Sequence, residues 1–253
     1  MCYKLISGCT DGDACSVILW LFYSVDSQPT SLGIELIRDP VISHADQSAD
    51  TRGVISVCVL NDGRIVTVGR GFIELRDSNL SVIKSQSIKG WAVCVRRYSA
   101  SDDCIAVGVR NNPNLVVSVF SLDLVFIRKL VEVKTGDYLT HFDISSSCMA
   151  VVSYSDKCLK LFSADGSLPV ADIPLTGMSC PKGVCISADE KFVLVSDWGG
   201  LVRKYQLTGS RSLVWECQGL SKPTSITEGK QEEFYVSSSD AAEIYVISDK
   251  GKS

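Results

Sequence analysis

The sequence holds few of the residues from which catalytic and metal sites are built. Its 253 residues include only two histidines, His44 and His141, and no C-x-x-C or H-x-x-x-H spacing. A zinc site needs three or four converging ligands, and a hydrolase-type serine sits in a G-x-S-x-G turn, which the sequence also lacks. His44 lies in a polar connection and His141 in a strand pattern. We therefore expect no catalytic residues, no metal and no cofactor, and interpret the chain as a non-enzyme.

Long hydrophobic runs are missing as well. The longest, Val17–Tyr23, has seven residues, whereas a helix that spans a bilayer needs about 20. Acidic residues precede this run, which disfavours a signal peptide. The chain shows no helical periodicity and no Ser- or Gly-rich linker, and its net charge is only −4. These absences predict one soluble, cytoplasmic domain without a membrane segment, and they give no sign of a strongly basic nucleic-acid-binding protein.

Cysteine, in contrast, is abundant, with 11 residues. Cys58, Cys94 and Cys185 occupy the same column of three repeats, so they belong to different structural units and are badly placed to pair. Inside apolar strand patterns a thiol acts as a small hydrophobic side chain. We predict reduced, buried cysteines, as is usual in a cytosolic protein.

An internal repeat organises the chain. The segment Pro181–Tyr205 reads as strand, polar turn, strand, Gly-rich turn and strand, and the pattern returns 42 residues later, with Pro223 on Pro181 and Phe234 on Phe192. A repeat of this length that consists only of strand patterns is typical of a β-propeller blade. Turns such as Asn61-Asp62-Gly63 favour the tight hairpins that join the strands of a blade.

The repeat predicts an all-β fold, a single six-bladed β-propeller over residues 1–253. Four blades are expected to be complete, at 53–90, 91–136, 137–177 and 178–219, and two partial, at 1–40 and 220–253. The last blade lacks its outer strand and the first lacks its inner strand. A segment before Met1 would supply both strands. We hypothesise that the chain is a fragment, a truncated gene model, or a propeller that closes imperfectly.

Two of the blades carry a family resemblance. Pro181, the strand Gly183–Ile186, the turn Ser187–Glu190 and the strand Val193–Asp197 resemble an NHL repeat. The Asn-Arg pair usual before the third strand is missing, so WD-type and YVTN-type propellers stay open. The resemblance implies a propeller like those at the C-terminus of tripartite-motif and Brat-like proteins, which bind protein or RNA, whereas others carry a lyase activity.

The sequence predicts a binding surface made of loops. The loops that join second to third strands, and one blade to the next, share one face of a propeller, and Arg and aromatic residues on such loops are typical of binding hot spots. The candidate binding residues are Arg70, Trp91, Arg110, Tyr138, Tyr154, Lys182 and Trp198. For Trp91 and Trp198, packing between blades is an equal alternative.

The first hypothesis is an interaction module that binds a protein or peptide partner through this loop face, as the substrate-recruiting part of a tripartite-motif-like ubiquitin ligase. The alternative is an RNA-binding propeller, which would need a basic face because phosphate contacts dominate affinity. A propeller lyase or hydrolase is a third reading.

Overall fold

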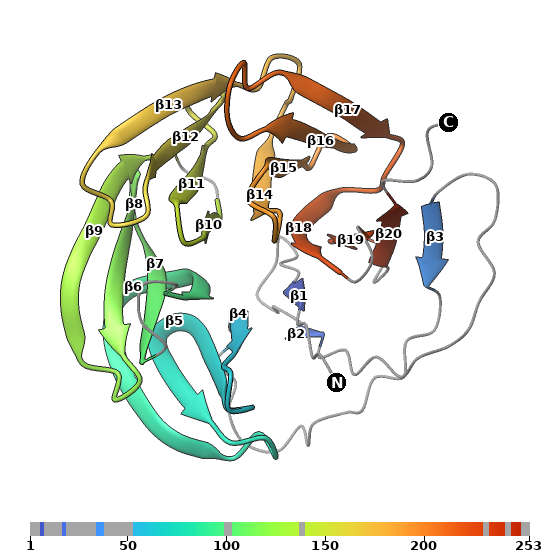
Figure 1. The fold of residues 1–253 in the computed structure, drawn as a ribbon. Helices are drawn as coiled ribbons and strands as arrows, with labels where there is room; N and C mark the ends of the chain where they lie inside the picture. The colour runs from blue at the N-terminus through green and yellow to red at the C-terminus, as the bar shows by residue number, and fades with distance from the viewer. Residues whose placement is uncertain are drawn as a thin grey trace.

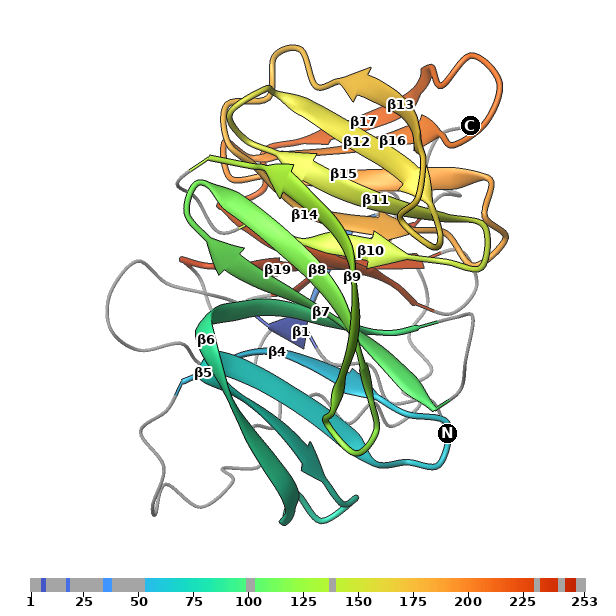
Figure 2. The same cartoon turned by 90° about the vertical axis from the view of Figure 1, so that its left-hand side faces the viewer.

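The described part of the chain folds into β-strands only, arranged around a centre like the blades of a propeller (Figure 1). The computed structural model describes residues 6–7, 17–18, 34–37, 53–98, 103–136, 140–229, 233–240 and 244–248. The strands run from one face of the ring to the other (Figure 2). The prediction of an all-β, propeller-like fold is confirmed, and no helix that could cross a membrane occurs among these residues.

Two sheets are simple four-stranded meanders, in which each strand pairs with the next one along the chain. In both, the first strand lies beside the centre and the last at the rim (Figure 1). The first contains β10 (Phe142–Ile144), β11 (Cys148–Ser153), β12 (Cys158–Ser163) and β13 (Pro169–Pro174). The second contains β14 (Pro181–Ile186), β15 (Phe192–Asp197), β16 (Leu201–Gln206) and β17 (Leu213–Gln218).

The expectation of six blades is wrong, because residues 53–136 form one six-stranded sheet. Its strands are β4 (Val54–Val59), β5 (Ile65–Arg76), β6 (Val82–Arg97), β7 (Cys104–Asn111), β8 (Asn114–Ser121) and β9 (Phe126–Lys134). The long strand β6 pairs with β5 through its first half and with β7 through its second half. Gly90 allows this continuity: its φ of +99° suits glycine, and a Cβ there would lie 3.0 Å from the Arg110 carbonyl oxygen. The described residues thus form four sheets of four or more strands.

The last sheet takes its outer strand from the beginning of the chain. The strands β18 (Pro223–Glu228), β19 (Glu233–Ser238) and β20 (Ile244–Ser248) are followed in the sheet by β3 (Ile34–Ile37), which pairs antiparallel with β20. The hypothesis that a segment before Met1 supplies this outer strand is therefore wrong, as is the placing of residues 34–37 in a separate first blade. The short strands β1 (Ile6–Ser7) and β2 (Val17–Ile18) pair with each other, and β1 contacts both β4 and β18.

Hydrophobic clusters fill the spaces between neighbouring sheets. Leu159 of β12, for example, belongs to one buried cluster with Val184 of β14 and Val195 of β15. Each such side chain contributes about 1.5–3 kcal/mol when fully buried. At Gly183 the inner strands come so close that a Cβ would lie 2.3 Å from the Thr224 carbonyl oxygen. Five of the eight described cysteines are buried, among them Cys94 and Cys185, whereas Cys58, which was also predicted to be buried, is partly exposed.

Candidate functional site

The turns of the sheets divide the ring into two faces. In an antiparallel meander the turns after the first and third strands lie at one end of the sheet, and the turn after the second strand and the link to the next sheet lie at the other. We call the second end the loop face. In the six-stranded sheet, β5 changes its partner from β4 to β6 after Gly69, and Trp91 of β6 pairs with Arg70 and with Arg110 at the turn between β7 and β8, so residues 69–71 and 88–91 belong to the loop face. Arg76 at the end of β5 reaches back to the Thr67 hydroxyl, which places the following turn at the other end. The described residues of the loop face are 69–71, 88–91, 110–114, 134–136, 154–157, 175–182, 198–200, 218–223 and 239–240. The opposite end, which we call the acidic face, comprises 61–64, 77–80, 97–98, 103, 121–125, 145–147, 163–168, 187–192, 207–212 and 228–229.

Three of the predicted binding residues meet at the six-stranded sheet. Trp91 of β6 lies opposite Arg70 of β5 on one side and Arg110 of β7 on the other. The guanidinium carbon of Arg70 lies 3.9 Å from the centre of the Trp91 ring, and that of Arg110 lies 5.7 Å from it. Both distances are in the range of a cation–π contact. Trp91 is partly exposed, and its buried part packs against the hydrophobic cluster between this sheet and the next, which contains Phe142.

A second set has the same composition. Lys182 and Lys222 place their Nζ atoms 4.3 and 5.0 Å from the centre of the Trp198 ring. The Trp198 Nε1–H donates to the Ser239 hydroxyl at 2.8 Å, which fixes the ring against the next sheet. Lys222 also pairs with the Asp240 carboxylate. Trp198 is likewise partly exposed.

A third set lies between these two along the chain. Lys157 Nζ lies 3.7 Å from the centre of the Tyr154 ring, and it donates to the Ser179 carbonyl oxygen of the following link. The structure thus pairs six of the seven predicted residues with ring or cation partners on the loop face. Tyr138 lies outside the described residues. Lys157 and Lys222 were missed in the sequence. Each follows a polar residue, Asp156 or Ser221, and each lies close to an aromatic ring in the structure.

The two faces differ in charge. The described loop face carries seven basic residues, Arg70, Lys89, Arg110, Lys134, Lys157, Lys182 and Lys222. It has two acidic residues, Asp156 and Asp240. The described acidic face has four basic and eight acidic residues, the latter being Asp62, Asp77, Asp103, Asp123, Asp165, Asp189, Glu190 and Glu228. A chain with a nearly balanced total charge therefore presents one cationic and one anionic end.

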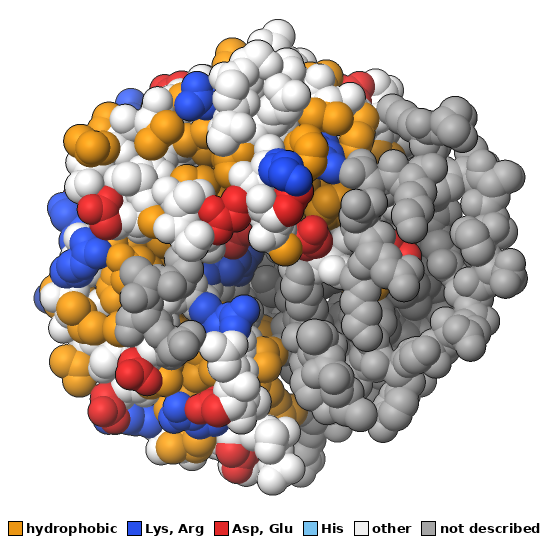
Figure 3. Space-filling model, viewed as in Figure 1, with side chains coloured by type: hydrophobic (Ala, Val, Ile, Leu, Met, Phe, Trp, Pro, Cys, Tyr) orange, Lys and Arg blue, Asp and Glu red, His pale blue; other side chains and the backbone are white. Residues whose placement is uncertain are grey.

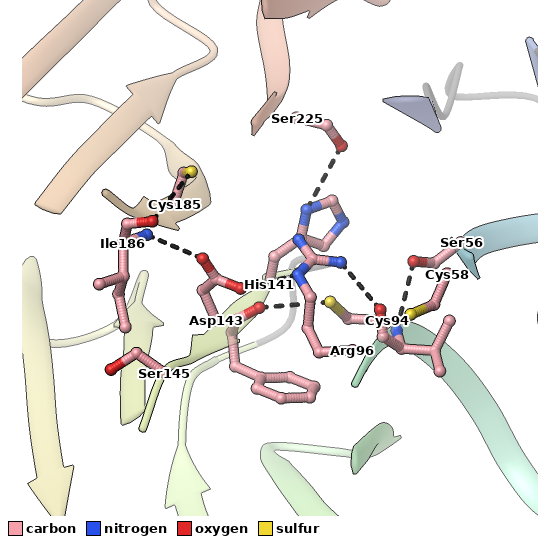
Figure 4. Close-up of polar contacts among 12 residues, drawn as sticks. Ser56, Cys58, Cys94, Arg96, His141, Asp143, Ser145, Cys185, Ile186 and Ser225 are labelled. Atoms are coloured by element: carbon pink, nitrogen blue, oxygen red, sulfur yellow. Dashed lines mark hydrogen bonds and ion pairs between the residues drawn. The ribbon is translucent and has the colours of Figure 1, made fainter. Parts of the chain in front are cut away.

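A polar network lies at the hub, between the two faces. Arg96 of β6 forms an ion pair with Asp143 of β10, with Nε 2.8 Å from Oδ1, and the other Asp143 oxygen accepts from the Ile186 backbone N–H at 2.8 Å. The three side chains of Arg96, His141 and Asp143 point toward one another (Figure 4). The Asp143 carboxylate therefore ties the inner strands of three sheets together. Figure 3 shows Lys and Arg side chains beside the centre of the ring on the face that it draws.

The hub environment controls protonation. Burial lowers the pKa of His141 to about 3, and the nearby Arg96 and Lys182 charges add to this effect, so the imidazole is neutral at pH 7. Its Nδ1 lies 3.4 Å from the Ser225 hydroxyl oxygen. Burial raises the pKa of the Cys58 thiol to about 11, partly offset by Arg96 and Arg97, so no thiolate forms there at neutral pH. His141 and Cys58 are thus both uncharged at neutral pH, and the contact between His141 and Ser225 links two sheets.

Within the described ranges, no group of three or more His, Cys, Asp or Glu side chains is arranged to hold a metal ion. The hub network was not foreseen, because Arg96 and Asp143 are 47 residues apart and neither stands in a motif. The sequence placed His141 in a strand pattern and gave it no role. A charged residue in the innermost-strand column is the only signal that could have pointed to the hub.

A scan against models of protein families finds no match to this chain. A search of curated proteins finds no relative either.

Proposed function

We propose that this chain is a non-catalytic interaction module that binds a protein partner through its loop face. The observation that supports this is the repeated grouping of a cation with an aromatic ring at three places on that face. Aromatic and Arg side chains dominate the energetics of protein interfaces. Partly exposed rings that are held by cations and hydrogen bonds lose little conformational freedom when a partner binds, which lowers the cost of association.

We extend this proposal to the repeat family, the role in a larger protein and the cellular location. The Pro181 repeat supports assignment to NHL-type propellers, and the substrate-recruiting role in a ubiquitin ligase of the tripartite-motif type goes with that assignment. The burial of five of the eight described cysteines, where a thiol serves as a small apolar side chain, supports a reducing, cytoplasmic location.

RNA binding is a second candidate, favoured by the seven basic residues of the loop face. Single-stranded RNA is usually held by bases that stack on open aromatic rings. On this face a base that stacks on Trp91 or Trp198 must compete with a cation within about 4 Å of the ring. The protein partner is therefore the better supported candidate.

Site-specific photo-crosslinking tests the proposal. A photoreactive amino acid replaces Thr176 on the loop face or, as a matched control, Ser78 on the acidic face; both residues are exposed and uncharged. In cell extract we expect protein adducts from position 176 that persist after nuclease treatment. Adducts that disappear with nuclease would favour RNA, and adducts formed only from position 78 would contradict the proposed face.

A further inference from the structure

We propose that the partner presents an acidic segment, a run of Asp and Glu side chains, to the loop face. This inference rests on the proposed function and specifies the chemistry of its ligand. The loop face offers three exposed cations, Arg70, Lys89 and Lys134, and Arg70 is also held by an aromatic ring. Carboxylates form charge-assisted hydrogen bonds with Arg and Lys, the strongest polar contacts available to a peptide.

The cations of the loop face are poorly neutralised by the protein itself. Arg70, Lys89 and Lys134 are exposed, and none of them has a carboxylate partner among the described residues. On the acidic face the situation is reversed, since Arg64 pairs with Asp62 and Lys191 with Asp189. Because these three cations form no ion pair among the described residues, none of those pairs has to break before they bind an external carboxylate.

The rings also set where the cations lie. Because Arg70 is held over Trp91, its guanidinium is restrained before the ligand arrives, which reduces the entropy lost on binding. The exposed cations Arg70, Lys89 and Lys134 would also steer an anionic segment toward this face. An acidic peptide can bind these restrained cations without stacking on an aromatic ring, whereas an RNA base has to stack on one.

The test uses the full chain and three labelled probes, with binding followed by fluorescence anisotropy at low and at near-physiological salt. The probes are a 12-residue peptide rich in Glu and Asp, the same peptide with Gln and Asn at those positions, and a single-stranded RNA of 12 nucleotides. We expect the acidic peptide to bind at least about ten-fold more tightly than its amide counterpart, and its affinity to fall as salt rises.

Two charge-removing double variants locate the site. Arg70→Gln with Lys134→Gln should weaken binding of the acidic peptide about five- to ten-fold, and Lys89→Gln with Lys157→Gln provides a second, independent pair. Arg64→Gln with Lys191→Gln on the acidic face is the matched control and should leave the affinity unchanged. Near-UV circular dichroism checks that each variant is folded.

Equal binding of the acidic and amide peptides, or tighter binding of RNA than of the acidic peptide, would overturn the inference. So would an equal loss of affinity in the control variant. The two proposals fail in distinguishable ways: protein adducts from position 176 without preference for the acidic peptide reject only the acidic ligand. The absence of protein adducts at position 176 rejects the interaction module.

Discussion

The two faces of the ring use charge for different purposes. On the acidic face several carboxylates accept hydrogen bonds from the turns that carry them. Asp62 accepts from the Arg64 backbone N–H at 3.0 Å, Asp77 from that of Asn79 at 2.9 Å, and Asp165 from that of Ser167 at 3.0 Å. Aspartate stabilises tight turns in this way. The acidity of this face is therefore explained by local structure and calls for no ligand.

On the loop face only part of the positive charge has a local role. Lys157 donates to the Ser179 carbonyl oxygen and Lys222 pairs with Asp240. The exposed Arg70, Lys89 and Lys134 bond to no backbone group or carboxylate among the described residues. Hydrogen bonds to Ser163 and Ser167 lower the pKa of Asp165 on the acidic face to about 2, which shows how fully that carboxylate is used. The comparison shows that the charge of a face indicates ligand binding only where the charged side chains have no structural role.

The sharpest contrast within one residue type is between Asp197 and Asp165. Asp197 on the β15 exit is buried and accepts from the backbone N–H groups of Ser179 and Cys180 and from the Ser179 hydroxyl. Asp197→Ala should lower the free energy of unfolding by about 3 kcal/mol, because two backbone donors lose their acceptor. Urea denaturation measures this.

The matched change on the acidic face is Asp165→Ala, which removes a carboxylate from an exposed turn. It should have a much smaller effect on the urea midpoint than Asp197→Ala. Similar losses of stability in the two variants would show that the buried Asp197 contributes no more to the free energy of unfolding than the exposed Asp165 does.

The hub that joins the two faces should respond to acid. The pKa of His141 is about 3 in the folded state and about 6.5 when unfolded, so between these values the unfolded chain binds the additional proton. The stability contributed by neutral His141 is complete above pH 6.5 and falls as the pH is lowered, by up to about 1.4 kcal/mol per unit. His141→Gln should reduce this acid sensitivity. Thermal unfolding between pH 7 and pH 4 compares the two proteins, and parallel curves would contradict the desolvation of His141.

The local pattern revealed the strands and the likeness to a propeller, but not how the sheets join. Alternation in Leu159–Leu161 marks a strand with one buried side, and the Asp-Gly turn closes a hairpin with Gly63 at φ +86°. The six-blade expectation failed at Gly90, where nothing local tells a turn from a strand that continues. It failed again where β3 joins β20, since pairing between distant strands leaves no local signature. The loop face could be predicted from the order of the strands, whereas the ion pair between Arg96 and Asp143 could be found only in the structure.

The rings of the two faces should differ in their effect on binding. On the loop face, Trp91→Leu removes the ring that holds Arg70 and should weaken the acidic peptide about five-fold, the equivalent of about 1 kcal/mol. On the acidic face, Arg128 donates to the Tyr98 hydroxyl at 2.7 Å. Tyr98→Phe is the control and should leave the affinity unchanged. Peptide anisotropy measures both, and an unaffected Trp91→Leu variant would separate the ring from the binding role of the face.

The smallest expected effect concerns a contact between sheets on the acidic face. Glu190 accepts from the Ser146 backbone N–H at 3.0 Å and from the Ser146 hydroxyl at 2.6 Å, and these bonds lower its pKa below the usual 4.5. The lowered pKa means that the stabilisation is complete above about pH 4.5 and is lost as the pH falls through the lower folded value. Glu190→Gln should therefore cost about 0.5 kcal/mol at pH 7 and almost nothing at pH 3.

The matched control is Asp123→Asn, whose carboxylate lies 3.1 Å from Lys84 Nζ and accepts from no backbone group of the described residues. An exposed ion pair of this kind contributes little to stability, and 0.5 M salt screens it. Urea unfolding at both pH values, with and without salt, separates the two cases. A loss in Glu190→Gln that disappears in salt would mean that Glu190 acts as a surface charge. A loss that persists in salt and disappears only at low pH would mean that the carboxylates of the acidic face are structural, in contrast to the cations of the loop face.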